Sequence, residues 1–285
     1  MGLVDATTAL ASSDYTITRY AGQANSAGGA TPGPALSSKL SFVVGVGLDS
    51  AGNLYIADPN NVAIEKVTAG GTLSILAGTG QTGPPVPGPA SSSTLNNPAG
   101  VVADSAGNVY IADQNNHAIE KVALDGTLSV FAGIPGVTGL PTAGPATSSH
   151  LNNPDAIAID SADNVYIADY GNAVIEKVTP AGQLSVIAGI PGSAGTPTAG
   201  PATSSHLSQA NGVAVDSAGN VYIADGGPNV IAKVTLAARS RSSPGSRGHP
   251  PSPPRAWPPP PRSAIPMASV STLWAPCTSL TTWPT

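Results

Sequence analysis

Aspartate recurs along the chain in two series whose members lie 55 or 56 residues apart, and these side chains are the first that could do chemistry. The series are Asp49, Asp104, Asp160 and Asp216, and Asp58, Asp113, Asp169 and Asp225. The second series could form a ring of carboxylates for a hard cation such as calcium, which takes oxygen ligands. The alternative is structural, with the first series closing Asx turns and the second capping loop entries. We expect the structural roles, because residues that recur identically serve each repeat.

Two histidines are repeat-equivalent and raise the possibility of a zinc site. His150 and His206 each stand in Ser-Ser-His-Leu, whereas Thr94 takes that place one repeat earlier and His117 lies on a different turn. The alternative is that they are solvent-exposed residues of long connectors, which we expect. The sequence therefore predicts no cofactor and no metal, with calcium or zinc as the alternative.

Motifs for catalysis are absent from the sequence. It contains no G-x-S-x-G nucleophile elbow, and no P-loop or G-x-G-x-x-G motif in a strand–turn–helix setting. Asp155, Asn211 and His117 break the repeat, so they are the candidates for an enzyme site. The near-uniformity of the repeats otherwise indicates a scaffold.

The elements that position these residues follow from the repeat, whose phrase D-S-A-G/D-N-L/V-Y-I-A-D begins at Asp49, Asp104, Asp160 and Asp216. A period of this size indicates a solenoid, propeller or array, and each unit reads as four short strands separated by turns. We predict an all-β fold, a β-propeller of four-stranded antiparallel blades with about four legible blades. The blades are expected at about 41–78, 97–133, 153–189 and 209–235.

The segment Tyr15–Gly22 resembles the last strand of each repeat, so we predict an outer strand there that closes the ring by joining its two ends. Residues 1–14 are expected to be disordered. Long connectors rich in Gly, Pro, Thr and Ser should form a rim on one face, with one helical turn at 146–151 and another at 202–207. The repeated tyrosines are expected in the core between blades, with each hydroxyl at a polar edge. The Glu-Lys pairs at 65–66, 120–121 and 176–177 are expected at packing and solubility positions.

Charge is divided unevenly along the chain. All 16 Asp and Glu precede residue 236, together with six of the 11 Lys and Arg, so this part carries a net charge of about −10. Nucleic-acid binding needs Lys and Arg against phosphates, so the sequence disfavours it. No apolar run approaches the ~18 residues that span a membrane. The single Cys leaves the compartment open: export if the true start lies upstream, and the cytoplasm otherwise.

The repeat stops at Leu236, and residues 236–285 form a Pro/Arg/Ser-rich tail. Back-translated and read in another frame, the start of this tail gives Gly-Gly-Thr-Leu-Ser-Val-Ile-Ala-Gly, the strand that is due at this point. The sequence therefore favours a frameshift near Thr235 in a disordered tail, and the alternative is a genuine basic appendage.

The pattern N-P-x-G/A-[VI]-[AV]-x-D-S-A-G-N-[VL]-Y-[IV]-A-D-x-x-N-N-x-x-I-x-K-V resembles the NHL repeat, over residues 45–234 and the strand at 15–22. The resemblance implies a six-bladed propeller whose first and last strands share a blade, and such folds host binders and enzymes alike. The sequence departs from the family where Ala63, Ala118, Val174 and Val230 replace an arginine. Four repeat cores stand where six are expected, so we expect an open ring. The alternative is a ring of four blades, closed if Tyr15–Gly22 completes the blade that contains Asp216.

We therefore expect a non-catalytic scaffold that binds a protein, peptide or glycan through the loops of one face. The alternatives are a metal-dependent hydrolase or lyase and a truncated product without independent function.

Overall fold

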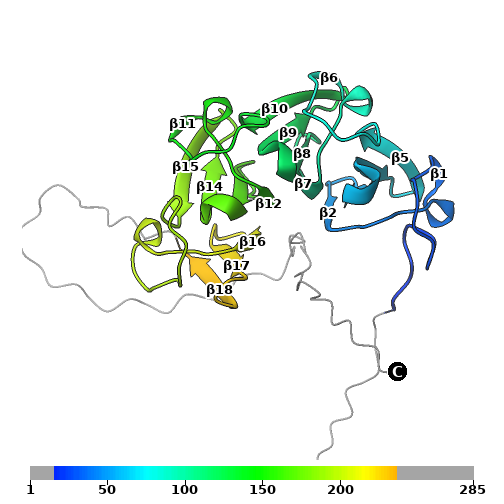
Figure 1. Cartoon of the computed structure of the whole chain (residues 1–285). Coiled ribbons are helices and arrows are strands. Elements are labelled where there is room, and N and C mark those ends of the chain that lie inside the picture. The colour runs from blue at the N-terminus through cyan, green and yellow to red at the C-terminus, as the bar shows by residue number, and fades with distance from the viewer. Residues whose placement is uncertain (1–15, 236–285) are drawn as a thin grey trace, which may run out of the picture.

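The structure, a computed structural model, describes residues 16–235, and it is all-β there. Four antiparallel sheets lie one after another as the blades of a propeller, in an open arc (Figure 1). The predicted fold class is confirmed. The predictions made for residues 1–15 and for the tail at 236–285 lie outside the described residues. Among the residues described, no helix is long and apolar enough to cross a membrane.

Each blade is built from strands in sequence order, running outward from the propeller axis. The first strands are β2 (Gly45–Leu48), β7 (Pro98–Ala103), β12 (Pro154–Ile159) and β16 (Ala210–Val215). The second strands are β3 (Leu54–Asp58), β8 (Val109–Asp113), β13 (Val165–Asp169) and β17 (Val221–Asp225). The third strands are β4 (Ala63–Val67), β9 (Ala118–Val122), β14 (Val174–Val178) and β18 (Val230–Val234). The fourth strands are β5 (Thr72–Ala77), β10 (Thr127–Gly133) and β15 (Gln183–Ala188).

A short fifth strand, which sequence reasoning did not predict, lies outside the fourth strand in the first three blades. These strands are β1 (Gly33–Pro34), β6 (Gly88–Pro89) and β11 (Gly144–Pro145). Each comes from the connector that precedes its blade and pairs antiparallel with the fourth strand. Among the described residues, the sheet of the fourth blade holds only β16, β17 and β18.

Single turns of 3-10 helix punctuate the connectors and the loops between the second and third strands. The connector turns are η1 (Ala35–Ser37), η3 (Ala90–Ser92), η5 (Ala146–Ser148) and η7 (Ala202–Ser204). The loop turns are η2 (Pro59–Asn61), η4 (Gln114–Asn116) and η6 (Tyr170–Asn172). The helical turns predicted at 146–151 and 202–207 are thus confirmed.

The inner strands pack edge to edge around the axis, β2 beside β7, β7 beside β12 and β12 beside β16. Glycine permits this approach: a Cβ atom on Gly45 would lie 2.2 Å from the carbonyl oxygen of Ala99. A Cβ on Gly47 would lie 2.5 Å from the carbonyl oxygen of Val101. Any larger residue at either position would push the first two blades apart.

The hydrophobic core lies between blades rather than within them. The first interface packs Tyr55 and Ile64 of one blade against Val101 and Ile111 of the next, and the same positions meet at the two later interfaces. Alternation along each strand produces this pattern, because successive side chains face the preceding and the following blade in turn. The predicted place of the repeated tyrosines is confirmed.

Two predictions about elements are wrong. Residues 16–22 form no strand, because none of them pairs with a strand of the described sheets, and Gly22 donates its N–H to Ala35, outside the strands. The expectation of packing and solubility positions for the Glu-Lys pairs is wrong only in its second part: Glu65, Glu120 and Glu176 are completely buried packing residues. Glu120 and Glu176 point to the face packed on the preceding blade, and Glu65 points to the corresponding outer face of the first blade. The lysine beside each glutamate points to the other face.

Candidate functional site

The aspartates at the ends of the second strands are buried and hold the connectors in place. Asp58 accepts hydrogen bonds from the backbone N–H groups of Ser41 at 2.7 Å and Phe42 at 3.1 Å, and from Asn61 Nδ2 at 2.8 Å. Asp113, Asp169 and Asp225 accept backbone N–H groups at the equivalent connector positions. These carboxylates therefore act as caps of the loops, which is the structural alternative given above. Each bonds within its own blade, and the four do not gather in a ring.

The other series of aspartates lies at the opposite end of the second strands. Asp49 Oδ1 accepts the N–H groups of Ala51 and Asn53, both at 2.9 Å, which is the predicted Asx turn. Its Oδ2 accepts the Tyr55 hydroxyl at 2.9 Å, and the Lys66 ammonium lies 5.5 Å from the centre of the tyrosine ring. All four blades repeat this arrangement. It joins the first three strands of a blade and leaves no group free for chemistry.

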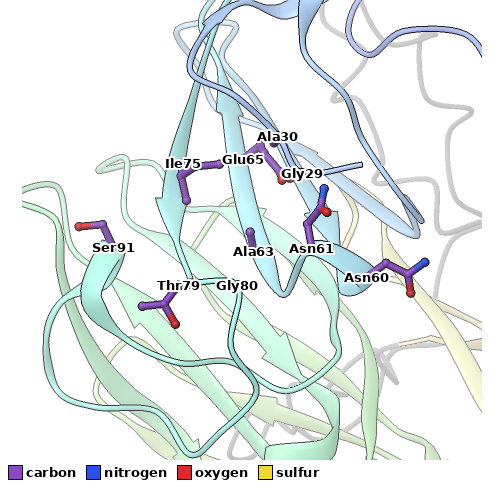
Figure 2. A pocket seen from close by; sticks show the side chains of 11 residues that line it. Gly29, Ala30, Asn60, Asn61, Ala63, Glu65, Ile75, Thr79, Gly80 and Ser91 are labelled. Atoms are coloured by element: carbon purple, nitrogen blue, oxygen red, sulfur yellow. The ribbon is translucent and has the colours of Figure 1, made fainter. Parts of the chain in front are cut away.

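A cavity of about 570 Å³ opens on the first blade beside the buried Glu65. Figure 2 shows Glu65 between Ile75 on one side and Gly29 and Asn61 on the other. Burial, followed by the charge of Asp58, raises the pKa of Glu65 to about 8, so this carboxyl group is protonated at neutral pH. The equivalent glutamates of the next two blades, Glu120 and Glu176, are also completely buried, and they lie between blades. Glu65 is thus a repeated core residue at the end of the arc, and not a dedicated site.

The residues that differ most between repeats meet at one place near the axis. Gln114 Nε2 donates to Asp155 Oδ1 at 3.0 Å, and Asn211 Nδ2 lies 3.5 Å from Asp155 Oδ2. Asn97 Nδ2 donates to Gln114 Oε1, which extends the chain of contacts further. These four residues, Asn97, Gln114, Asp155 and Asn211, are the axial cluster. They come from the second, third and fourth blades, and each is partly exposed.

Electrostatically, the axial cluster is a carboxyl group among neutral amides. The pKa of Asp155 is raised by burial, and its hydrogen bond from Asn211 opposes that shift. Among the described residues the ion pair that forms joins Lys177 to Asp160 at 3.8 Å, so Asp155 has no cationic partner there. The cluster can donate and accept hydrogen bonds at once, as a ligand with many hydroxyl or amide groups requires.

The structure brings together two of the three residues predicted for an enzyme site. Asp155 and Asn211 share a contact, whereas His117 ends η4 in the left-handed conformation, with Nδ1 accepting the Asn153 N–H at 3.1 Å. Burial lowers the pKa of His117.

The two histidines considered for zinc lie in separate connectors. His206 bonds the carbonyl of Ser193 within its own connector at 2.9 Å. His150 packs against Gly139 in the equivalent connector.

No group of three or more His, Cys, Asp or Glu able to hold a metal occurs within residues 16–235. His150, His206 and the buried aspartates therefore stand apart from one another. A ligand set for calcium or zinc would have to draw on other oxygen donors.

Sequence reasoning missed Gln114 and Asn97. The signal was present in the repeat itself, because the position of Gln114 is held by Pro59, Tyr170 and Gly226 in the other blades. A position that varies while its neighbours stay constant marks the place where the blades cease to be equivalent.

Comparison with known proteins agrees with the fold. The family model of the NHL repeat matches residues 95–121. Over 200 residues the chain is 28% identical to teneurin-3 of Mus musculus. The aligned region covers 61% of this chain and 7% of teneurin-3.

Two solved structures from Bacteroides thetaiotaomicron VPI-5482 are similar in fold. A structural genomics protein of unknown function superposes with a TM-score of 0.54 at 20% identity, covering 66% of this chain and 46% of its own. An auxiliary nutrient binding protein superposes with a TM-score of 0.53 at 18% identity, covering 65% and 45%. This chain thus spans less than half of either solved protein.

Proposed function

Because this chain is an NHL-repeat β-propeller, we propose that it is a non-catalytic scaffold that binds a glycan at the axial cluster. One observation carries the proposal: the amides of Gln114 and Asn211 converge on the carboxyl group of Asp155 from two other blades. Paired carboxyl and amide groups suit neighbouring sugar hydroxyls, which donate and accept together.

The surroundings of the axial cluster support a neutral ligand. Four of the five lysines in the described chain lie on the third strands, away from this cluster, and each places its ammonium group over a tyrosine ring of the second strand. An anionic ligand would meet Asp155 without a compensating cation. A polyhydroxylated neutral ligand carries no such cost, because it needs hydrogen-bonding partners rather than charge.

Calorimetric titration of the full chain tests the proposal, using neutral oligosaccharides first selected on a glycan array. We expect Asp155→Ala to weaken binding about tenfold or more, since it leaves two ligand-facing amides without their common acceptor. The control is Asp125→Asn, which removes an exposed carboxylate from a turn far from the axis. Absence of binding to every neutral oligosaccharide, or equal binding by Asp155→Ala, would refute the glycan proposal. Binding of peptides instead would assign the cluster to a protein ligand.

A metal-dependent hydrolase or lyase is the second candidate, favoured by the meeting of the asymmetric residues Asp155 and Asn211. Calcium ions prefer such oxygen donors. Titration of the chelator-treated chain with calcium or zinc tests this candidate. Stoichiometric binding that Asp155→Asn abolishes would support it, and failure of both ions to bind would exclude it.

A further inference from the structure

Within residues 16–235, the fourth blade has a slot at the position that the fourth strand takes in the other blades. In the first blade, β5 lies between β4 and β1 and pairs with both. In the fourth blade the third strand β18 and the segment at 200–201, which matches β1, are both present. A cavity of about 290 Å³ lies against both, and Gly200, Leu207, Ile223, Ala232 and Val234 are among its lining residues. The residues that line the slot are mostly apolar.

At the other end of the arc, residues 16–22 have the features of a fourth strand without a blade. Their sequence, Thr-Ile-Thr-Arg-Tyr-Ala-Gly, parallels Thr-Leu-Ser-Ile-Leu-Ala-Gly at 72–78. Gly22 donates its N–H to the Ala35 carbonyl at 2.9 Å, as Gly78 does to Ala90 at 3.1 Å. Both glycines have positive φ, +83° and +97°. Residues 16–22 therefore attach to the first blade as the last strand of a preceding blade would.

The side chains of this segment suit the slot. In the first blade Leu73 lies opposite Val67 and is completely buried, so the equivalent Ile17 would lie opposite Val234. Ile17 is fully exposed as the chain stands. Seating it in the apolar slot would remove its surface from water, which favours the association of an aliphatic side chain with an apolar site.

A second pair of positions distinguishes this slot from the rest. The residue that faces Glu65 in the first blade is Ile75. By the same register Arg19 would face Ala232, the one third-strand position where alanine replaces the buried glutamate. The small alanine leaves room for the arginine, and the buried Asp225 lies on the neighbouring strand, diagonal to Ala232. Arg19 would therefore be complementary to the fourth blade in both charge and volume, and the other blades lack this combination because they carry glutamate at the position of Ala232.

The open face of the fourth blade would be covered by the same contact. Ile231 is 66% exposed, whereas the equivalent Ile64, Ile119 and Ile175 are 0% exposed beneath the following blade. On the first blade, Leu48 of the inner strand is 41% exposed, while the equivalent Ala103 is 9% exposed. These two ends are the two halves of an interface that the chain already forms three times.

We propose that this chain associates head to tail with a second copy of itself, with residues 16–22 of one copy forming the fourth strand of the other copy's last blade. Because Gly22 is bonded to Ala35, seating this strand also stacks the first blade of one copy on the open face of the other. The same copy does not supply the strand, because the first blade and β18 lie at opposite ends of the arc (Figure 1). Backbone pairing on both sides gives affinity, and Ile17 and Arg19 give register.

Sedimentation velocity of the full chain, from about 1 to 200 μM, tests this proposal. We expect a monomer of 27.9 kDa that gives way to multiples of that mass as concentration rises. Ile17→Asp disrupts the strand that one copy donates, and Ile231→Asp disrupts the open face of the fourth blade that receives it. Each variant alone should therefore remain monomeric. An equimolar mixture of the two variants should form a heterodimer, because the Ile231→Asp variant keeps an intact donated strand and the Ile17→Asp variant keeps an intact fourth blade. The control Leu124→Asp places an acid on a distant exposed turn and should associate like the parent chain.

A further variant fills the slot from within the same chain. Insertion of Gly-Gly-Thr-Leu-Ser-Val-Ile-Ala-Gly directly after Leu236 gives the same turn length as in the other blades, supplies a fourth strand in cis and should abolish association. Self-association that survives this insertion, a parent chain that stays monomeric throughout, or a mixture of the two aspartate variants that stays monomeric while both retain the parent's thermal unfolding midpoint would each overturn the proposal.

Discussion

Glu120 on β9 and Asp113 on β8 are diagonal neighbours in the interface between the first two blades, and neither side chain is exposed to solvent. Burial, followed by the charge of Asp113, raises the pKa of Glu120 well above its ordinary value. Burial also raises the pKa of Asp113 to about 6, against hydrogen bonds from Asn116 and the Asn96 N–H. The two carboxyl groups cannot both ionise there without placing like charges side by side in a region of low dielectric.

This pair and its two counterparts should make the fold less stable as pH rises. The pKa of Glu65 is raised from 4.5 to about 8, so its native form holds a proton that its unfolded form has lost between those values. The contribution of Glu65 to the free energy of unfolding is therefore complete below about pH 4.5 and is lost as pH rises through 8. Urea denaturation at about pH 5, 7 and 9 should show a falling free energy of unfolding.

The variant Glu120→Gln should flatten that pH dependence, because glutamine keeps the shape and has no proton to lose. Asp125→Asn is the matched control: it removes an exposed carboxylate whose pKa lies below its ordinary value, so it should not alter the slope above pH 5. A free energy of unfolding that rises from pH 5 to 9 in the parent chain would contradict this account.

The close approach of the inner strands gives a second prediction. Gly45→Ala should destabilise the fold by about 1 to 3 kcal/mol, because the new methyl group would meet the Ala99 carbonyl oxygen in the adjacent blade. The control is Gly29→Ala, since no atom lies within 4 Å of a Cβ at that position. Thermal unfolding followed by circular dichroism compares the two variants. Equal midpoints would mean that the blades can separate at no cost.

The sequence was sufficient for the propeller because each blade repeats the same alternation and the same turns. Asp49 closes its turn and Tyr55 lies between blades, both as the repeated spacing predicts. The buried glutamates could not be predicted in this way. A glutamate beside a lysine on a strand is typical of a solvated edge, and only the packing of the preceding blade removes Glu120 from water.

The candidate site was predictable in part, through residues that break the repeat. Asp155 and Asn211 stood out on that ground and do meet, whereas His117 lies in a separate contact with Asn153. Gln114 was missed because it occupies a loop where most residue types are tolerated. Its role depends on how neighbouring blades are placed around the axis, which no local sequence pattern specifies.

The repeated hydrogen bond between tyrosine and aspartate gives the last prediction. Tyr110 donates its hydroxyl to Asp104 Oδ2 at 3.2 Å in the core between the second and third blades. Burial, followed by the charge of Asp104 and this hydrogen bond, raises the pKa of the tyrosine. Tyr110→Phe should cost about 1 to 2 kcal/mol, because a buried charged acceptor loses one donor. The same change at Tyr222, on the open face of the fourth blade, should cost less, since water can replace the lost donor there. Urea denaturation of both variants near pH 6 measures the difference. Equal losses at the two positions would show that the interface between blades does not exclude water from Asp104.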